Sequence, residues 1–368
     1  MRGNKEFIVT RKSFANKGKG LSTAINRIIK ENNMEYFHND IISSAYIGEG
    51  FYVNSQDLGN APIKTYGYDV HWAYGGTLLN NKFPLSSYTS PNKTELGIQE
   101  IMFDNFKHRY NDYDYTLFLK SMWKDKNKKY HFRATTLDVE ILKDMYILEN
   151  VKLVNETYFE DIGEMPEELK KLVRECYKIK KQGITDEEKT ALEASFYGKF
   201  ATCYSKYEKL NGEKYKVFHK ALEETGYPEI RDKRTPIAMF QAAYQRHREW
   251  QQFKKHINDG ILYMNTDSIM FDNDVKIETG NDIGEWGNEY NGEEIFYIRR
   301  NAYIVLDDKG NIKKRVLGGI INPEVIGKKE LKMLASGQPV MCKAWTDKQH
   351  TKMRDITLEP SFYKEYYY

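Results

Sequence analysis

Hydrophobic residues alternate with polar ones in some parts of the chain and recur every three to four residues in others, so both strands and helices are predicted. Residues 63–73 are rich in β-branched and aromatic side chains and predict a strand. Residues 130–160 mix strand-like pieces around a helical segment over residues 138–150. Helical periodicity predicts further helices over residues 77–84 (ended by Pro84), 164–182, 184–200 and 236–257.

Two of these helices carry recognisable start signals. Pro166 lies near the start of one helix, acidic residues follow in its first turn and lysines end it. Thr185 precedes the next helix and Glu188 follows three residues later, which predicts a capping box. Because helices and strands do not alternate in βαβ order, the predicted fold class is α+β.

Length and composition narrow the class of protein. With 368 residues and 43.4 kDa, two or three domains are expected. Mean hydropathy is -0.72, and no stretch approaches the roughly 18 apolar residues of a membrane span, so no membrane partner is expected. The N-terminus lacks the apolar core of a signal peptide. The three cysteines suit a reducing compartment, and we expect a cytoplasmic protein.

Net charge is only +3, but the charge is unevenly distributed. Residues 1–30 carry eight Lys or Arg against one acid. Other basic clusters occupy residues 124–133, 178–182, 246–256 and 309–315, and many of the 28 tyrosines lie beside them. Basic grooves with aromatic platforms bind single-stranded nucleic acid, although lysine runs are more often solvated surfaces and tyrosines half-buried packing.

The segment Ile261–Asp274 predicts a hairpin, with apolar half-strands on both sides of a polar tip. Asn265 and Asp267 are separated by one residue there, so a regular strand would direct both to one face. One interpretation is an Asx-turn that closes the hairpin. The other is a divalent-metal site, because Mg²⁺ prefers hard oxygen ligands and a two-metal site needs a second carboxylate from elsewhere.

Three segments in order resemble motifs of family B DNA polymerases. Residues 263–268 (YMNTDS) resemble motif C, residues 69–74 (DVHWAY) motif A, and residues 194–200 (ASFYGKF) motif B. Residues 46–50 (YIGEG) are similar to the Tyr-x-Gly-Gly segment, and residues 301–303 (NAY) lie where the family has Lys-x-Tyr. Spacing is most similar to that of the protein-primed polymerases of small phages and linear plasmids, over about residues 44–305.

The resemblance implies a right-hand polymerase with an antiparallel palm sheet, and Mg²⁺ (two ions, with Mn²⁺ as a possible substitute) held by Asp69, Asp267 and the Val70 carbonyl, with Asn265 beside them. We expect carboxylates about 4–5 Å apart. Val70, Tyr74, Tyr197 and Gly198 are implied to contact the incoming dNTP, with Lys189 near its phosphates. The implied contacts to primer-template DNA are Tyr46, Gly48, Lys199, Ser268, Arg300 and Tyr303. A helical tyrosine is otherwise usually core, and Gly198 also suits a helix end.

The resemblance also implies a domain plan. It comprises an N-terminal basic and template-binding segment (1–62), a first palm segment (63–165), fingers (166–200), an insertion (201–234), a second palm segment (235–305) and a thumb-like region (306–368). Too few residues precede Tyr46 for a proofreading exonuclease domain, so none is expected in this chain. The basic helix 246–256 and the fingers cations are expected to flank one DNA-binding groove, and a terminal protein is a possible further partner.

Four positions depart from the family pattern. Asn265 replaces the first motif C Asp, Thr190 a phosphate-binding Lys, Ala194 the motif B Asn, and Asn301 the Lys of Lys-x-Tyr. Each loss weakens the expected catalysis, because phosphate clamps act through charge at a defined place. Two functions therefore remain: an active DNA polymerase without proofreading, or a degenerate polymerase fold that serves as a nucleic-acid-binding replication subunit.

Overall fold

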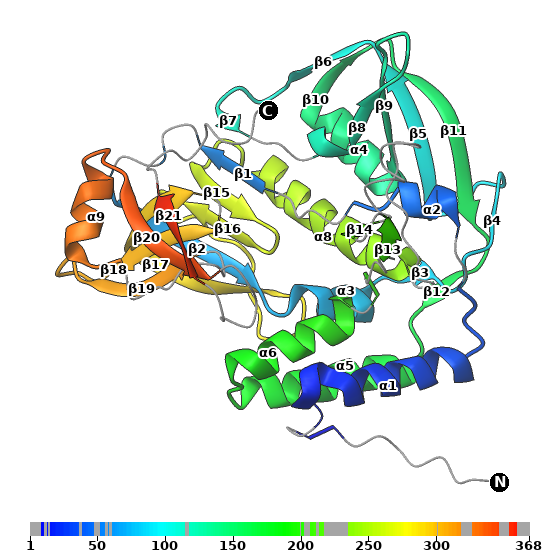
Figure 1. Cartoon of the computed structure of the whole chain (residues 1–368), viewed down its shortest axis with the longest axis horizontal. Helices are drawn as coiled ribbons and strands as arrows, with labels where there is room; N and C mark the ends of the chain where they lie inside the picture. The colour runs from blue at the N-terminus through cyan, green and yellow to red at the C-terminus, as the bar shows by residue number, and fades with distance from the viewer. Residues whose placement is uncertain are drawn as a thin grey trace.

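The computed structural model describes residues 9–10, 13, 15–36, 39–47, 52–55, 58, 61–114, 118–198, 200–201, 207–210, 213–216, 235–299, 301–317, 326–345 and 353–358. Helices mix with antiparallel sheets, as the sequence predicted (Figure 1). The helices are α1 (Ala15–Glu31), α2 (Asp40–Ser44), α3 (Ala73–Asn80), α4 (Thr136–Met145), α5 (Glu167–Lys181), α6 (Asp186–Glu193), α8 (Thr235–His256) and α9 (Lys328–Ala335), with a 3₁₀ turn η2 (Leu119–Ser121) and a π-helical segment η3 (Ala194–Gly198).

The largest sheet has eight strands in the order β19-β18-β17-β2-β16-β15-β1-β7. Strands β15 and β16 are strongly apolar, and all four side chains of β16 are buried, because the sheet is covered on both faces there. The predicted hairpin is confirmed as β15 and β16. The strands are β1 (Tyr52–Ser55), β2 (Ile63–Val70), β7 (Tyr113–Asp114), β15 (Ile261–Asn265), β16 (Ser268–Phe271), β17 (Trp286–Arg299), β18 (Ala302–Leu306) and β19 (Ile312–Leu317).

A second sheet has five strands in the order β4-β11-β5-β9-β8, and Figure 1 shows it on the opposite side of α8 from the larger sheet. Its strands are β4 (Thr89–Ser90), β5 (Gly97–Phe103), β8 (Met122–Lys124), β9 (Tyr130–Thr135) and β11 (Lys152–Phe159). Two-stranded pairs complete the fold: β6 (Asn105–His108) with β10 (Tyr146–Glu149), β3 (Lys82–Pro84) with β12 (Ile162–Glu164), β13 (Tyr207–Leu210) with β14 (Glu213–Lys216), and β20 (Val340–Trp345) with β21 (Met353–Leu358).

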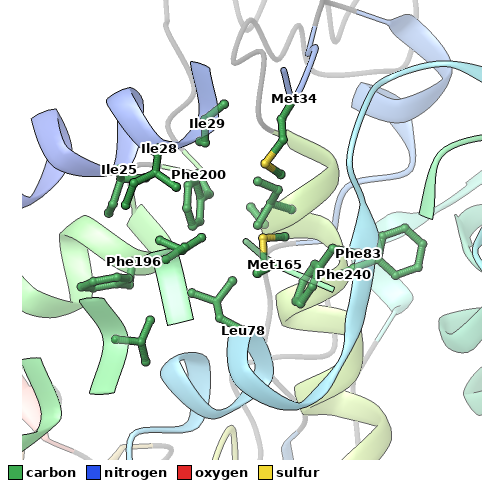
Figure 2. Close-up of a cluster of buried hydrophobic side chains, with 14 of the residues drawn as sticks. Ile25, Ile28, Ile29, Met34, Leu78, Phe83, Met165, Phe196, Phe200 and Phe240 are labelled. Atoms are coloured by element: carbon green, nitrogen blue, oxygen red, sulfur yellow. The ribbon is translucent and has the colours of Figure 1, made fainter. Parts of the chain in front are cut away.

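Helices α1, α5 and α6 lie together below the larger sheet in Figure 1. The predicted capping box starts α6: the Thr185 N–H donates to Glu188 Oε2 (2.9 Å), and the Glu188 N–H donates to Thr185 Oγ1 (3.2 Å). Figure 2 shows the isoleucines of α1 above Phe196 of η3 and beside Phe200, so the apolar face of α1 covers η3. This core fixes the segment that resembles motif B.

Two local predictions were wrong. The helix expected over residues 77–84 starts earlier, at Ala73, and ends at Asn80, because Asn81 is extended and β3 pairs with β12. Phe83 is completely buried within this strand. Residues 146–149, expected to be helical, form β10 because Tyr146 is extended and its ring packs against Phe106. Tertiary packing overrides local helical propensity at both places.

Within the described residues, no helix has both the length and the apolar character that a membrane crossing requires.

Candidate active site

Asp69 and Asp267 meet at one end of the larger sheet. Asp69 lies near the end of β2 opposite Ser268, the first residue of β16. Asp267 lies in the two-residue turn before β16, and its carbonyl oxygen accepts a hydrogen bond from the Val70 N–H (2.8 Å). Two adjacent strands therefore hold both acids at the same edge, as expected from the motif order.

The turn that presents Asp267 is strained. Thr266 has a φ of 58°, which a β-branched residue rarely adopts. Its carbonyl oxygen accepts a hydrogen bond from Gln245 Nε2 (2.7 Å), and the Asp267 N–H donates to the Asn265 carbonyl (2.6 Å). Strain of this kind costs about 1–3 kcal/mol and is concentrated at functional sites, so the turn is itself a sign of function.

The two acids lie in a surplus of negative charge. Burial, followed by the charge of Asp267, raises the pKa of Asp69 to about 8. Burial, followed by the charge of Glu193, raises the pKa of Asp267 to about 6. Glu289 adds to both shifts, whereas Lys180 and Lys189 oppose them. Such a site is stabilised by added positive charge.

The candidate ligands at this site are hard oxygen atoms, the kind of donor that Mg²⁺ prefers. Among the described residues, no three His, Cys, Asp or Glu side chains are close enough together to enclose an ion. Mg²⁺ is usually bound by one or two carboxylates and keeps waters and substrate phosphate oxygens as its remaining ligands. The Val70 carbonyl belongs to the same strand end and was expected as a further ligand.

Three tyrosines form a cluster beside the acids. The ring of Tyr74, from α3, stacks on that of Tyr197, from η3, with centroids 4.1 Å apart and planes 14° from parallel. The Tyr46 hydroxyl lies 3.0 Å from the Tyr197 hydroxyl. Gln241 Nε2 donates to the carbonyls of Tyr74 (3.3 Å) and Phe196 (3.0 Å), so α8 holds both aromatic segments. The structure thus brings together three residues that the motifs singled out.

Gly198 ends η3 directly after Tyr197. Short π-helical turns are rare and occur frequently at functional sites. Gly198 and Tyr197 are both partly exposed, so this turn is accessible at the surface.

Two lysines on neighbouring helices influence the acids through their charge. The charge of Lys189, on α6, lowers the pKa of Asp69 and Asp267 despite its displacement by one residue from Thr190. Lys180, on α5, acts on the same pair, and its Nζ lies 4.0 Å from Glu193 Oε1. Burial, more than the neighbouring charges, lowers the pKa of Lys180.

Asn265 and Asn301 contact each other: Asn265 Nδ2 donates to Asn301 Oδ1. The Ser268 hydroxyl donates to the Asn265 carbonyl (3.2 Å) and is nearly buried. Tyr303 is also nearly buried, and its hydroxyl lies 3.2 Å from that of Tyr290. Ser268 and Tyr303 therefore form part of the interior of the sheet.

Several expected site residues fall outside the described residues of the chain, namely Gly48, Lys199 and Arg300. The backbone of Thr190 and Ala194 belongs to α6 and η3. Within the helix expected to flank the groove, Arg246 is completely buried in an ion pair with Asp138, so it cannot bind phosphate at the surface. Arg246 belongs to the basic helix 246–256, and its charge is neutralised inside the protein.

Solved structures of phi29 DNA polymerase share this arrangement of elements. Its complex with primer-template DNA and incoming nucleotide substrates matches with a TM-score of 0.63 and 17% identity, over 94% of this chain and 67% of that chain. Its complex with single-stranded DNA matches at 0.60 and 18%, and its post-translocation binary complex with primer-template DNA at 0.60 and 20%, each over 86% of this chain and 61% of that one. The fold is polymerase-like.

The sequences themselves are distant. No protein-family profile matches this chain, and no curated protein sequence matches it. At identities of 17–20% the structural likeness shows the fold alone. The chain also spans about two thirds or less of the phi29 polymerase chains, so activity and partners have to be argued from its own residues.

The candidate site also contains residues that sequence reasoning missed. Lys180 belongs to the basic cluster 178–182, but only the packing of α5 beside α3 directs it toward the acids. On α8, Gln241, Gln245 and Glu249 are buried at intervals of four residues. Polar residues that recur every four residues lie on one face of a helix, and this spacing was a signal of a functional face. Burial, then the charge of Asp267, raises the pKa of Glu249 well above its usual value.

Proposed function

We propose that this chain is a template-directed DNA polymerase that adds deoxynucleotides to a primer 3′-hydroxyl by two-metal phosphoryl transfer. The observation that carries the proposal is the convergence of Asp69 and Asp267 at one strained turn of a polymerase-like fold. The chain would be a nucleotidyltransferase of family B, most similar in its motifs to the protein-primed members.

Asp69, Asp267 and the Val70 carbonyl would hold two Mg²⁺ ions, or Mn²⁺ in their place. When bound, the ions lower the pKa of the attacking hydroxyl and neutralise charge on the leaving pyrophosphate. The protein's own contribution is rigidity: β2, β16 and the Val70–Asp267 hydrogen bond fix the acids before any ion arrives. The surplus of carboxylates makes the metal-free site unfavourable, which favours ion uptake.

The tyrosine cluster would form the nucleotide pocket. Tyr74 would lie under the deoxyribose and exclude a 2′-hydroxyl, whereas Tyr197 and Gly198 would cover the new base pair. Lys180 and Lys189 supply positive charge near the acids and would bind the triphosphate in place of a lysine at Thr190. Electrostatic stabilisation at a fixed place is usually the largest catalytic contribution.

The domain assignment follows from this role. The larger sheet would be the palm, α5 with α6 and η3 the fingers, and α9 with β20 and β21 the thumb. Primer-template DNA would contact Tyr46, Ser268 and Tyr303, with Gly48, Lys199 and Arg300 as further candidates. A terminal protein is a candidate partner on the strength of the motif resemblance alone.

A primer-extension assay with Mg²⁺ and Mn²⁺ tests the proposal. The chain should extend a primer with the nucleotide that the template specifies, and Asp69→Asn should abolish extension. Asp272→Asn is a matched control, because Asp272 is an exposed acid just beyond the opposite end of β16. Extension that survives Asp69→Asn, or that ignores the template, would refute the proposal.

The second candidate is a nucleic-acid-binding subunit that has lost catalysis. The observation in its favour is the loss of expected charges at Thr190, Asn265 and Asn301 and of an expected amide at Ala194. This function predicts salt-dependent binding of primer-template DNA with no extension under either metal ion. Affinity that does not change between low and moderate salt would exclude both functions.

A further inference from the structure

Two of the four departures from the polymerase pattern contact each other. Asn265 ends β15, and Asn301 lies in the turn between β17 and β18, 36 residues further along the chain. Their side chains are hydrogen bonded, with Asn265 Nδ2 as donor and Asn301 Oδ1 as acceptor. The contact joins the tips of two hairpins that both belong to the larger sheet.

The backbone of Asn301 is also held in place by a hydrogen bond and by its conformation. Its N–H donates to the Tyr263 hydroxyl (3.2 Å), and its φ of 58° lies in the left-handed region, where asparagine is favoured over most residues. Tyr263 is almost completely buried and packs against Tyr297 and Tyr303. The turn at Asn301 is therefore anchored to the core of the sheet.

Asn265 in turn is bonded to the turn that carries Asp267. Its carbonyl oxygen accepts from the Asp267 N–H (2.6 Å) and from the Ser268 hydroxyl (3.2 Å). A continuous path of hydrogen bonds thus runs from the Tyr263 hydroxyl through Asn301 and Asn265 to the Asp267 amide. Movement at Asn301 would be transmitted to the position of the Asp267 turn.

The net charge of positions 265 and 301 is zero both in the family pattern and in this chain. An Asp at 265 and a Lys at 301, the pattern that this sequence departs from, would sum to zero, and two asparagines also sum to zero. Asp267 follows Asn265 by two residues, and the charges of Asp69, Asp267 and Glu289 already act on one another there. A carboxylate at 265 without a cation at 301 would add like charge to this site, which is unfavourable.

We propose that Asn265 and Asn301 are positioning residues that act as one unit, a neutral amide pair that replaces an acid–base pair and holds the Asp267 turn. The pairing itself is a property of the fold, and only its effect on catalysis rests on the proposed function. The two departures are therefore a single coupled change, and neither position can be restored alone.

A double-mutant cycle on the full chain tests the pair. Asn265→Asp and Asn301→Lys should each destabilise the chain, but the double variant should be more stable than the product of the two effects predicts, by about tenfold in the unfolding equilibrium constant (~1.4 kcal/mol). Urea titration of all four proteins measures this quantity without any activity.

A matched control measures the backbone cost of lysine. Asn33 is exposed and has a φ of 55°, so Asn33→Lys places lysine in the same left-handed conformation away from the site. Asn33→Lys should combine additively with Asn265→Asp. Additive effects for Asn265→Asp with Asn301→Lys as well would overturn the proposal.

Primer extension adds a readout that a purely structural pair would not move. With Mg²⁺, Asn265→Asp alone should lower kcat at unchanged KM for the nucleotide, and the added Asn301→Lys should restore it. Coupling in urea without any extension by the parent chain would refute the proposed function and leave the pairing supported. A kcat that Asn301→Lys fails to restore, in a chain that does extend primers, would overturn the positioning role.

Discussion

Replacing Asp138 with asparagine should destabilise the chain strongly, because this carboxylate neutralises the buried Arg246. The two side chains are 0% and 1% exposed, and they join α4 to α8 through two hydrogen bonds. Arg246 Nε lies 2.7 Å from Asp138 Oδ1, and Nη2 lies 2.9 Å from Oδ2. Asparagine preserves the shape but leaves the guanidinium charge without a counterion.

The magnitude follows from burial. Removing one partner of a buried ion pair costs about 3–5 kcal/mol. For 368 residues that unfold as one unit, the unfolding entropy is about 0.8 kcal/mol per degree, so the melting temperature should fall by about 4–6 °C. Arg246 Nη1 also donates to the Ile47 carbonyl (2.9 Å), next to Tyr46, so primer extension should weaken with it.

The control makes the same chemical change at an exposed pair of equal length. Asp274 and Lys276 lie 2.7 Å apart, with side chains 50% and 78% exposed. Asp274→Asn should cost about 0–1 kcal/mol, or roughly 1 °C. Differential scanning fluorimetry of both variants measures the contrast. Equal shifts for Asp138→Asn and Asp274→Asn would refute the reasoning that burial decides the cost.

Three further results are expected. Lys180→Met should raise KM for the nucleotide about tenfold. Glu193→Gln should lower this KM, because it removes a carboxylate that holds Lys180. Steady-state primer extension measures both values. The metal-free chain should lose thermal stability as the pH rises from about 4 to 8. Burial raises the pKa of Asp69 to about 8 in the folded state, so protonation of Asp69 favours folding, and this stabilisation disappears as the pH rises through 8. Asp69→Asn should flatten that pH profile, and an unchanged profile would contradict the assignment. Tyr74→Val should reduce discrimination against ribonucleotides by about tenfold or more in single-nucleotide incorporation.

The elements of the fold that sequence predicted are those with local causes. The hairpin over residues 261–271 follows from apolar half-strands around a polar turn, and the start of α6 follows from Thr185 and Glu188. Strand β3 was missed because a partner in β12 decides its conformation, not its own residues. Local sequence patterns therefore predicted the turn that carries Asp267, but they did not predict which elements pack around that turn.

The non-local features of the site could not be predicted from spacing. Lys180 contributes only because α5 packs beside α3, and the contact of Asn265 with Asn301 joins two hairpins. Arg246 looked like a surface cation because its neighbours in the sequence are charged, and only Asp138, 108 residues away, accounts for its burial. Whether such a charged side chain is buried or exposed depends on partners that are distant in the sequence.

Binding of Mn²⁺ measured by electron paramagnetic resonance tests the central claim most directly, because it reports on the acids before any catalysis. With primer-template DNA and nucleotide present, the chain should bind two ions, Asp69→Asn should lose at least one, and Asp272→Asn should bind as the parent does. Equal uptake of Mn²⁺ by the parent and by Asp69→Asn would contradict a metal site at Asp69 and Asp267.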